Sequence, residues 1–190
     1  ANVTKTLPEG LMAAAINDFQ PNDYLIWYYN VKYFNQWSQM CGGSYSSDYT
    51  GQTENGGQGS QYIATLNYRN KIQQYIDQTG TVENNGFLAA TGIMTIYLAI
   101  FDTDMYGSIP YTEAAHYDDK GILTPKYEKV EDLYNLWIEE LNNYITMLQA
   151  GDLVSFKGQD AAYGCDWKKW ARFANSLKLK IAARLYNNEP

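Results

Sequence analysis

Apolar side chains recur every three or four residues along the last third of the sequence, a spacing that places them on one face of an α-helix. The two clearest segments run from about residue 130 to 149 and from about 170 to 185. Their apolar positions are Val130, Tyr134, Trp137, Leu141, Ile145 and Leu148 in the first, and Trp170, Ala174, Leu177, Ile181 and Leu185 in the second. No convincing alternation of apolar and polar residues indicates a strand. The sequence therefore predicts an all-α fold.

Residues 92–101, GIMTIYLAIF, are apolar on nearly every helical face. This run is too short to span a bilayer, and we expect no other stretch of the length that a membrane helix needs. It predicts a helix from about Phe87 to Asp104, buried in the middle of a helical protein. Gly107 suits a positive φ and Pro110 lacks an N–H group, so the chain should turn directly after this helix.

Three further helices are predicted in the first half of the chain. Pro8 suits the first position of a helix, Asn22 can cap the next one, and Asp166 can cap the helix near the end of the chain. The predicted ranges are Pro8–Asp18, Asp23–Met40 and Ser60–Gln78. Between the last two, residues 42–60 contain six glycines and almost no aliphatic side chain, which predicts a long surface loop. Six amphipathic helices joined by turns predict an array of stacked helix–turn–helix repeats.

The charge of the chain disfavours nucleic acid as a partner. The formal net charge is −7, and phosphate binding needs Lys and Arg clustered over most of one face. The distribution is uneven, because residues 1–166 carry 8 basic and 20 acidic side chains whereas residues 167–190 carry 6 and 1. We expect the basic helix to lie against acidic helices or to present a solvated face.

The stretch from Asp102 to Glu113 partly fits the frame of a calcium-binding loop. Asp102, Asp104, Gly107 and Glu113 stand at positions one, three, six and twelve of that frame. Position five, however, is Tyr106, which supplies no carboxylate or amide oxygen. We therefore expect no metal, with Asp104 capping or hydrogen-bonding the turn, and keep Asp102, Asp104 and Glu113 as calcium ligands only as an alternative.

The remaining reactive side chains do not form a coherent active site. His116 is the only histidine, so a catalytic triad or zinc site has no second imidazole. The adjacent pair Glu139 and Glu140 cannot face each other on a helix. Cys41 and Cys165 make neither a metal site nor a disulfide framework, and whether they pair stays open. We expect no enzyme activity and no cofactor.

Aromatic and amide side chains remain as the means of recognition. The chain has 18 Tyr and 5 Trp, which combine a flat apolar face with a polar tip and suit sugar rings or peptide side chains. Most of those on helices fall on apolar faces and should pack in the core. Those in or near the glycine-rich loop do not, and they predict a binding rim with its polar neighbours. The predicted rim consists of Trp37, Tyr45, Asp48, Tyr49, Gln52, Asn55 and Gln58.

Three separated blocks of the sequence resemble the SusD-like (SusD/RagB) family of nutrient-binding lipoproteins. DMYGSIPYTEA at 104–114 is similar to the signature D-x-Y-G-x-I-P-Y-x-E-A of the family. TPKY at 124–127 then opens a helix as in the family. WARFANSLKLKIAAR at 170–184 resembles the W-x-x-F-A-N-S-L-x-L-R-x-A-x-R helix, in which we take Asn175 as structural. The clear match covers residues 92–186.

The resemblance implies a tetratricopeptide-like helical-repeat scaffold. Because family members are several hundred residues long, residues 1–190 are expected to be the N-terminal helical part of one SusD-like domain, an incomplete array. The resemblance also implies a lipid-anchored cysteine upstream of Ala1 and a location on the outer surface of the outer membrane. The implied ligands are oligosaccharides or peptides, and the implied partner is a SusC-like TonB-dependent transporter. Family members contact ligand after the second helix, which favours the loop at 42–60.

Two other functions stay open. One is a helical-repeat adaptor that binds a protein partner and no nutrient. The other is an all-helical hydrolase built around His116 or around Asp102 and Asp104. The sequence does not identify the ligand.

Overall fold

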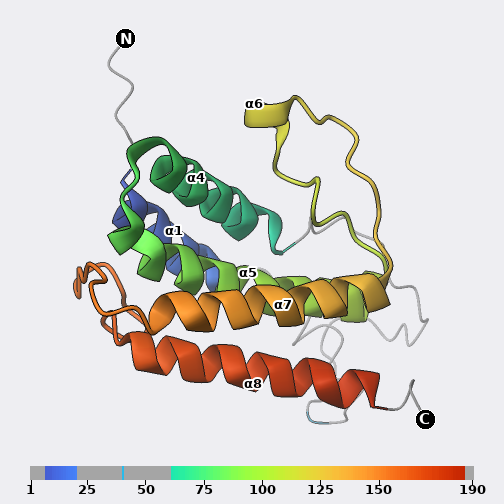
Figure 1. Ribbon diagram of the computed structural model, residues 1–190. Helices are drawn as coiled ribbons and strands as arrows, with labels where there is room; N and C mark the ends of the chain where they lie inside the picture. The colour runs from blue at the N-terminus through green and yellow to red at the C-terminus, as the bar shows by residue number, and fades with distance from the viewer. Residues whose placement is uncertain (1–6, 21–39, 41–60, 187–190) are drawn as a thin grey trace. The chain divides into compact units, whose positions relative to one another are not determined.

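The computed structural model describes residues 7–20, 40 and 61–186, and their regular structure is helical (Figure 1). The chain divides into two compact units, Ala1–Phe19 with Ser60–Pro190, and Gln20–Gly59. All the described helices belong to the first unit. They are α1 (Pro8–Phe19), α4 (Ile63–Thr79), the 3-10 turn η2 (Val82–Asn84), α5 (Asn85–Tyr106), α6 (Tyr117–Lys120), α7 (Val130–Leu148) and α8 (Trp167–Leu185).

The predicted all-α fold is confirmed, and so is each predicted helix within the described residues. The ends of α1, α4, α5 and α7 differ from the predicted ends by three residues or fewer. The sequence did not predict η2 or the four-residue helix α6, which is followed by Gly121 with a φ of 65°. Of the predicted helix Asp23–Met40, only Met40 is among the described residues. The loop at 42–60 lies outside them.

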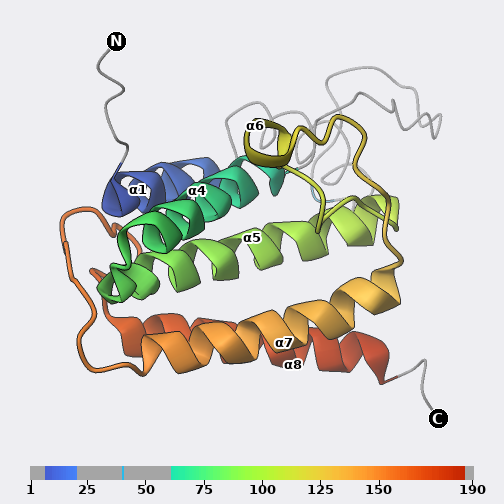
Figure 2. The same cartoon turned by 45° about the horizontal axis from the view of Figure 1, so that its top comes forward.

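Helix α5 is the centre of the first unit. It contacts α1 and α4 on one side and α7 and α8 on the other (Figure 2). Helices α4 and α5 form one pair and α7 and α8 another, and the contact between α5 and α7 joins the two pairs, as in a tetratricopeptide-like array. Sixteen of the 22 residues of α5 are buried. This burial confirms the prediction of a helix in the middle of the protein.

The expectation that no stretch has the length and composition of a membrane helix was wrong. The apolar helix continues on the N-terminal side of Gly92, so Val82–Tyr106 is long and apolar enough to cross a membrane by length and composition. However, 89% of its most apolar window is buried inside the protein. A core helix has that burial, because its apolar surface is already covered by neighbouring helices.

Two glycines let aromatic rings approach α5 closely. A Cβ atom on Gly92 would lie 2.3 Å from Cζ of Tyr144 on α7, and one on Gly86 would lie 2.7 Å from Cζ2 of Trp167 on α8. Both distances are shorter than any real contact of a Cβ atom, so the rings occupy the space that a side chain would fill. These two positions fix how close α7 and α8 lie to the central helix.

The predicted apolar stripes of α7 and α8 are largely confirmed. Trp137, Leu141 and Leu148 of α7 are buried, as are four residues of α8: Trp170, Ala174, Leu177 and Ile181. On α7 the stripe is rotated slightly, since Tyr144 is buried where Ile145 was expected and Ile145 is only partly buried. Asp166 caps α8 as predicted, with its carboxylate accepting a hydrogen bond from the Lys169 N–H at 3.2 Å.

The loop between α7 and α8 is organised around the buried carboxylate of Asp160, which is 2% exposed. It accepts hydrogen bonds from the backbone N–H groups of Ala162, Tyr163 and Cys165 at 2.8–2.9 Å. It also accepts one from the indole N–H of Trp170 at 2.8 Å. One side chain therefore ties this loop to the buried face of α8.

Candidate functional site

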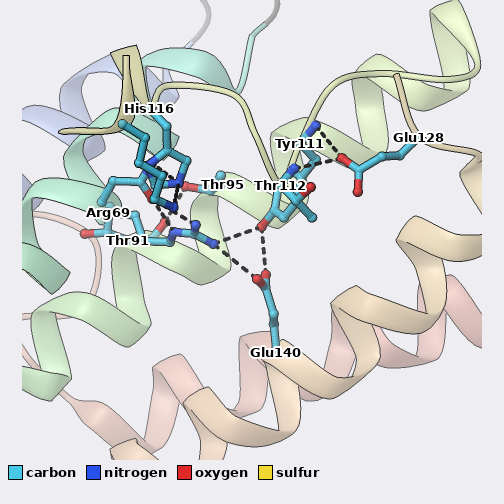
Figure 3. A network of polar contacts seen from close by, with 10 residues as sticks. Arg69, Thr91, Thr95, Tyr111, Thr112, His116, Glu128 and Glu140 are labelled. Carbon is cyan, nitrogen blue, oxygen red and sulfur yellow. Dashed lines mark hydrogen bonds and ion pairs between the residues drawn. The ribbon is translucent and has the colours of Figure 1, made fainter. Parts of the chain in front are cut away.

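The segment at 107–129, between α5 and α7, is folded back on itself by two carboxylates. Glu128 accepts hydrogen bonds from the backbone N–H groups of Tyr111 and Thr112 at 2.9 and 2.8 Å (Figure 3). The Lys126 N–H donates to Glu113 at 2.9 Å. The turn predicted after α5 is confirmed, because Gly107 has a φ of 76°. Glu113 thus joins the DMYGSIPYTEA block to the TPKY block, and Glu128, directly after TPKY, adds a second link.

A polar cluster anchors this segment to α4 and α7. The hydroxyl of Tyr111, which is 1% exposed, donates to Glu140 at 2.7 Å. Arg69 pairs with Glu140 at 3.2 Å and donates to the Tyr111 oxygen at 3.4 Å, so all three side chains converge (Figure 3). Burial, with the Glu140 charge adding to it, holds the pKa of Tyr111 well above its usual value. The hydroxyl therefore stays protonated and donates to the carboxylate.

The same cluster fixes the tautomer of His116. Arg69 can only donate, so the Asn70 atom that faces its Nε and Nη2, at 3.2 and 2.8 Å, is the amide oxygen. The amide nitrogen of Asn70 then faces Nε2 of His116 at 3.4 Å, and the Lys120 ammonium faces the same atom at 3.4 Å. Both neighbours are donors, so Nε2 accepts. Nδ1 carries the proton and donates to Asp119 at 2.8 Å.

These side chains border a pocket between α4, α6 and α7, which we call the α4–α7 pocket. Its volume is about 400 Å³. Carboxamides line part of it, and Leu88, Tyr144 and Met147 supply an apolar part. Burial raises the pKa of Tyr144 to about 12, so this hydroxyl is also neutral. The pocket joins hydrogen-bonding groups to apolar surface, a combination typical of small-molecule sites.

Sequence reasoning missed the contribution of α4 to this site. Arg69 and Asn70 interrupt the otherwise apolar stripe that includes Leu66 and Ile72. The available signal in the sequence was the pair Arg69–Asn70, a charged residue and an amide within a helix that is otherwise apolar on that face. The partner of Arg69, however, is Glu140 on another helix, and helical spacing within α4 does not reveal it.

The predicted binding rim cannot be compared with the structure. Trp37, Tyr45, Asp48, Tyr49, Gln52, Asn55 and Gln58 all lie outside the described residues. Cys41 does too, whereas Cys165 is a buried free thiol with a φ of 57°.

The three residues of the alternative calcium loop each have another partner. Asp102 accepts the Gln61 N–H at 2.7 Å, and Asp104 pairs with Arg184. Glu113 accepts from Lys126, as described above. Asp102 and Asp104 also lie inside α5 rather than in a loop. The part of the chain that the structure describes has no group of three His, Cys, Asp or Glu residues that could hold a metal ion.

The ion pair between Asp104 and Arg184 joins two of the sequence blocks across 80 positions, from the end of α5 to the end of α8. The Arg184 Nε donates to Asp104 at 3.0 Å. Asn175, in the third block, donates its amide to the Ala171 carbonyl of the same helix at 3.1 Å. The ion pair thus links two helices, and the Asn175 contact lies within α8.

Fold and site together define the class: a tetratricopeptide-like helical scaffold whose polar clusters are held by internal hydrogen bonds. Residues 3–190 match the SusD-like family that is described as starch-binding and associating with the outer membrane. This match spans nearly the whole chain. The chain belongs to the SusD-like family, as the three sequence blocks indicated.

Solved structures with the same fold include a chitin-binding protein, which has 26% sequence identity and a TM-score of 0.70 over 94% of this chain and 39% of that chain. A SusD homologue from Bacteroides uniformis ATCC 8492 has 28% identity and a TM-score of 0.56, over 66% of this chain and 25% of that chain. A SusD/RagB family protein from Bacteroides thetaiotaomicron VPI-5482 has 21% identity and a TM-score of 0.67, with 96% and 39% covered. The chain thus spans about two fifths of the length of the chitin-binding protein. The comparison with curated proteins found no match to this chain.

Proposed function

We propose that this chain is part of a cell-surface protein that binds oligosaccharides for uptake and does not cleave them. The observation that carries the proposal is the family match over residues 3–190, to a family described as starch-binding. The likeness to a protein named as chitin-binding, at 26% identity, adds support and favours sugars over peptides. Neither similarity distinguishes glucose polymers from polymers of N-acetylglucosamine, so both are candidate ligands.

In this proposal the helical array is a rigid support, and the loop at 42–60 together with Trp37 before it provides the binding rim. Tyr45, Tyr49 and Trp37 would stack on the faces of sugar rings, since aromatic rings and sugar faces are both flat and apolar. The amides and the acid of the rim would hydrogen-bond the hydroxyl groups. Binding of this kind needs neither a cofactor nor a nucleophile.

The proposal includes a SusC-like TonB-dependent transporter as the partner and a lipid anchor as the attachment to the outer membrane. The description of the family as associating with the outer membrane supports the location, and the transporter and the anchor are what the family resemblance implies. Copurification of the complete protein with an outer-membrane barrel from detergent-solubilised membranes is the expected result. The adaptor alternative predicts copurification without sugar binding.

Calorimetry on the complete protein tests the sugar-binding part. Titration with N-acetylglucosamine oligomers and with maltose oligomers should give saturable binding of at least one series. Tyr45→Ala and Tyr49→Ala should each weaken it by about tenfold, because each removes a stacking face. Tyr186→Ala is the matched control, since Tyr186 is an 83% exposed tyrosine at the C-terminal end of α8. Equal affinities for all three variants would rule out the rim.

A further inference from the structure

The α4–α7 pocket is a second place where the described residues have the properties of a ligand site. Its volume of about 400 Å³ falls in the range of about 300–1,000 Å³ that is typical of small-molecule pockets. It is built from rigid elements, because α4 and α7 both pack on the buried helix α5. It is also separate in sequence from the rim at 42–60.

Most of the charged side chains at this pocket already have partners within the protein. Arg69 pairs with Glu140 at 3.2 Å, and Asp119 accepts a hydrogen bond from Nδ1 of His116 at 2.8 Å. Asp77 accepts a hydrogen bond from the Gln73 amide at 2.8 Å. An ionic ligand would therefore compete with these pairs and lose its own hydration as well. Charge pairing favours a neutral ligand.

Lys120 is the exception, because none of the described residues forms an ion pair with it. Its ammonium group faces Nε2 of His116 at 3.4 Å, and the residue is exposed. An exposed ammonium group is well hydrated and adds little to the affinity for an anion. It still leaves a hydrogen-bond donor at the edge of the pocket.

Two carboxamides at the pocket have hydrogen-bonding capacity to offer. Gln74 on α4 and Asn143 on α7 both line it, and neither has a hydrogen-bond partner among the described residues. Each amide can donate and accept, which matches hydroxyl and acetamido groups. Met147 on α7 is only partly buried and offers apolar surface to the C–H side of a sugar ring, whereas Leu88 and Tyr144 line the pocket but are 2% and 6% exposed.

We propose that the α4–α7 pocket is a second saccharide site, which binds a short neutral sugar through Gln74 and Asn143 beside the apolar side chain of Met147. This inference rests on the proposed function, since it takes the ligand class from there. It adds a site that the glycine-rich loop does not contribute to, and a preference for neutral over charged sugars.

Hydrogen–deuterium exchange on the complete protein locates the site directly. The probes are N,N′-diacetylchitobiose and maltose, each compared with buffer alone. Protection at residues 70–77 and 143–147 supports the pocket, whereas protection at residues 42–60 supports the rim. Protection at the rim alone overturns the inference and leaves the proposed function standing. Protection at the pocket alone supports the inference and contradicts the rim, and protection at neither overturns both.

Variants and a charged analogue complete the test. Gln74→Ala combined with Asn143→Ala should weaken binding at the pocket by about tenfold or more, because two hydrogen bonds are lost. Gln78→Ala, which removes an exposed amide of α4 outside the pocket, is the matched control and should leave binding unchanged. Glucosamine, which is cationic, should protect the pocket less than N-acetylglucosamine does. Equal protection by both sugars, or an unchanged affinity of the double variant, overturns the inference.

Discussion

Gly92→Ala tests the packing of α7 on the central helix. In most helices this substitution stabilises by about 1 kcal/mol, because alanine has the higher helix propensity. At this position the added Cβ atom would lie 2.3 Å from Cζ and 2.5 Å from Cε2 and the hydroxyl oxygen of Tyr144. Tyr144 is only 6% exposed, so its ring has little space into which it can move.

The steric cost should exceed the gain in helix propensity. Overpacking of a well-packed core typically costs about 1–3 kcal/mol, and a shift of a buried ring belongs in the upper part of that range. We expect a net loss of about 1–2 kcal/mol in the free energy of unfolding. For a domain of this size that corresponds to a Tm lower by about 2–8 °C.

Thermal and urea denaturation followed by far-UV circular dichroism provide the measurement. Gly10→Ala is the control, because Gly10 lies on α1 with nothing within 4 Å of an added Cβ atom. It should leave stability unchanged or raise it by up to about 1 kcal/mol. In a Tyr144→Ala background, Gly92→Ala should no longer destabilise. A Gly92→Ala protein as stable as the wild type would refute the close approach of α7 to α5.

Three further predictions concern buried polar groups. Glu140→Gln leaves the Arg69 guanidinium without its ion pair and should destabilise by about 1–3 kcal/mol in urea denaturation, and a loss of less than 0.5 kcal/mol would contradict the role of this cluster. Burial raises the pKa of Asp102 to about 6, so the folded protein binds this proton more tightly than the unfolded chain does. The contribution of the Asp102 carboxyl group to the free energy of unfolding is therefore greatest below about pH 4. It falls by about 2–3 kcal/mol as the pH rises past 6. Asp102→Asn should remove this part of the pH dependence of Tm, and an unchanged pH profile would show that the carboxyl group is not buried. Asp160→Ala leaves four donors unsatisfied and should cost about 3 kcal/mol, whereas Asp152→Ala in the same loop should cost less than about 0.5 kcal/mol.

The helices followed from the sequence because their signals are local. Spacings of three and four residues reflect the helical repeat itself, so α7 and α8 could be placed to within a few residues. The cap at Asp166 and the positive φ at Gly107 are equally local, since each depends on one side chain and its immediate backbone. The apolar stretch of α5 was underestimated because it was taken to begin at Gly92, although small residues before that position, such as Ala89 and Ala90, are also buried.

The polar cluster could not be predicted in the same way. Arg69 and Glu140 are 71 positions apart, and Asp104 and Arg184 are 80 apart. No spacing rule connects residues on different helices, because their contact depends on how the helices pack. The sequence blocks contain Asp104 and Arg184, but a sequence pattern does not show which of its residues are in contact. The structure shows that these two form an ion pair with each other.

The α4–α7 pocket shows the same limit for a binding site. Nothing in the sequence distinguishes Gln74 and Asn143 from other polar residues, and they line one pocket only because α4 and α7 both pack on α5. The aromatic rim was proposed from composition, since tyrosines in a glycine-rich loop have no apolar face to occupy. The two sites therefore rest on independent features of the chain.

The most direct test of the account is to follow the fate of a sugar that the complete protein meets. Chitohexaose and maltohexaose are incubated with it, the retained fraction is separated by equilibrium dialysis, and the oligomers are analysed by mass spectrometry. We predict that at least one hexasaccharide is retained and recovered at its full length. Recovery of shortened oligomers, or no retention of either sugar, would contradict a binding protein of this kind.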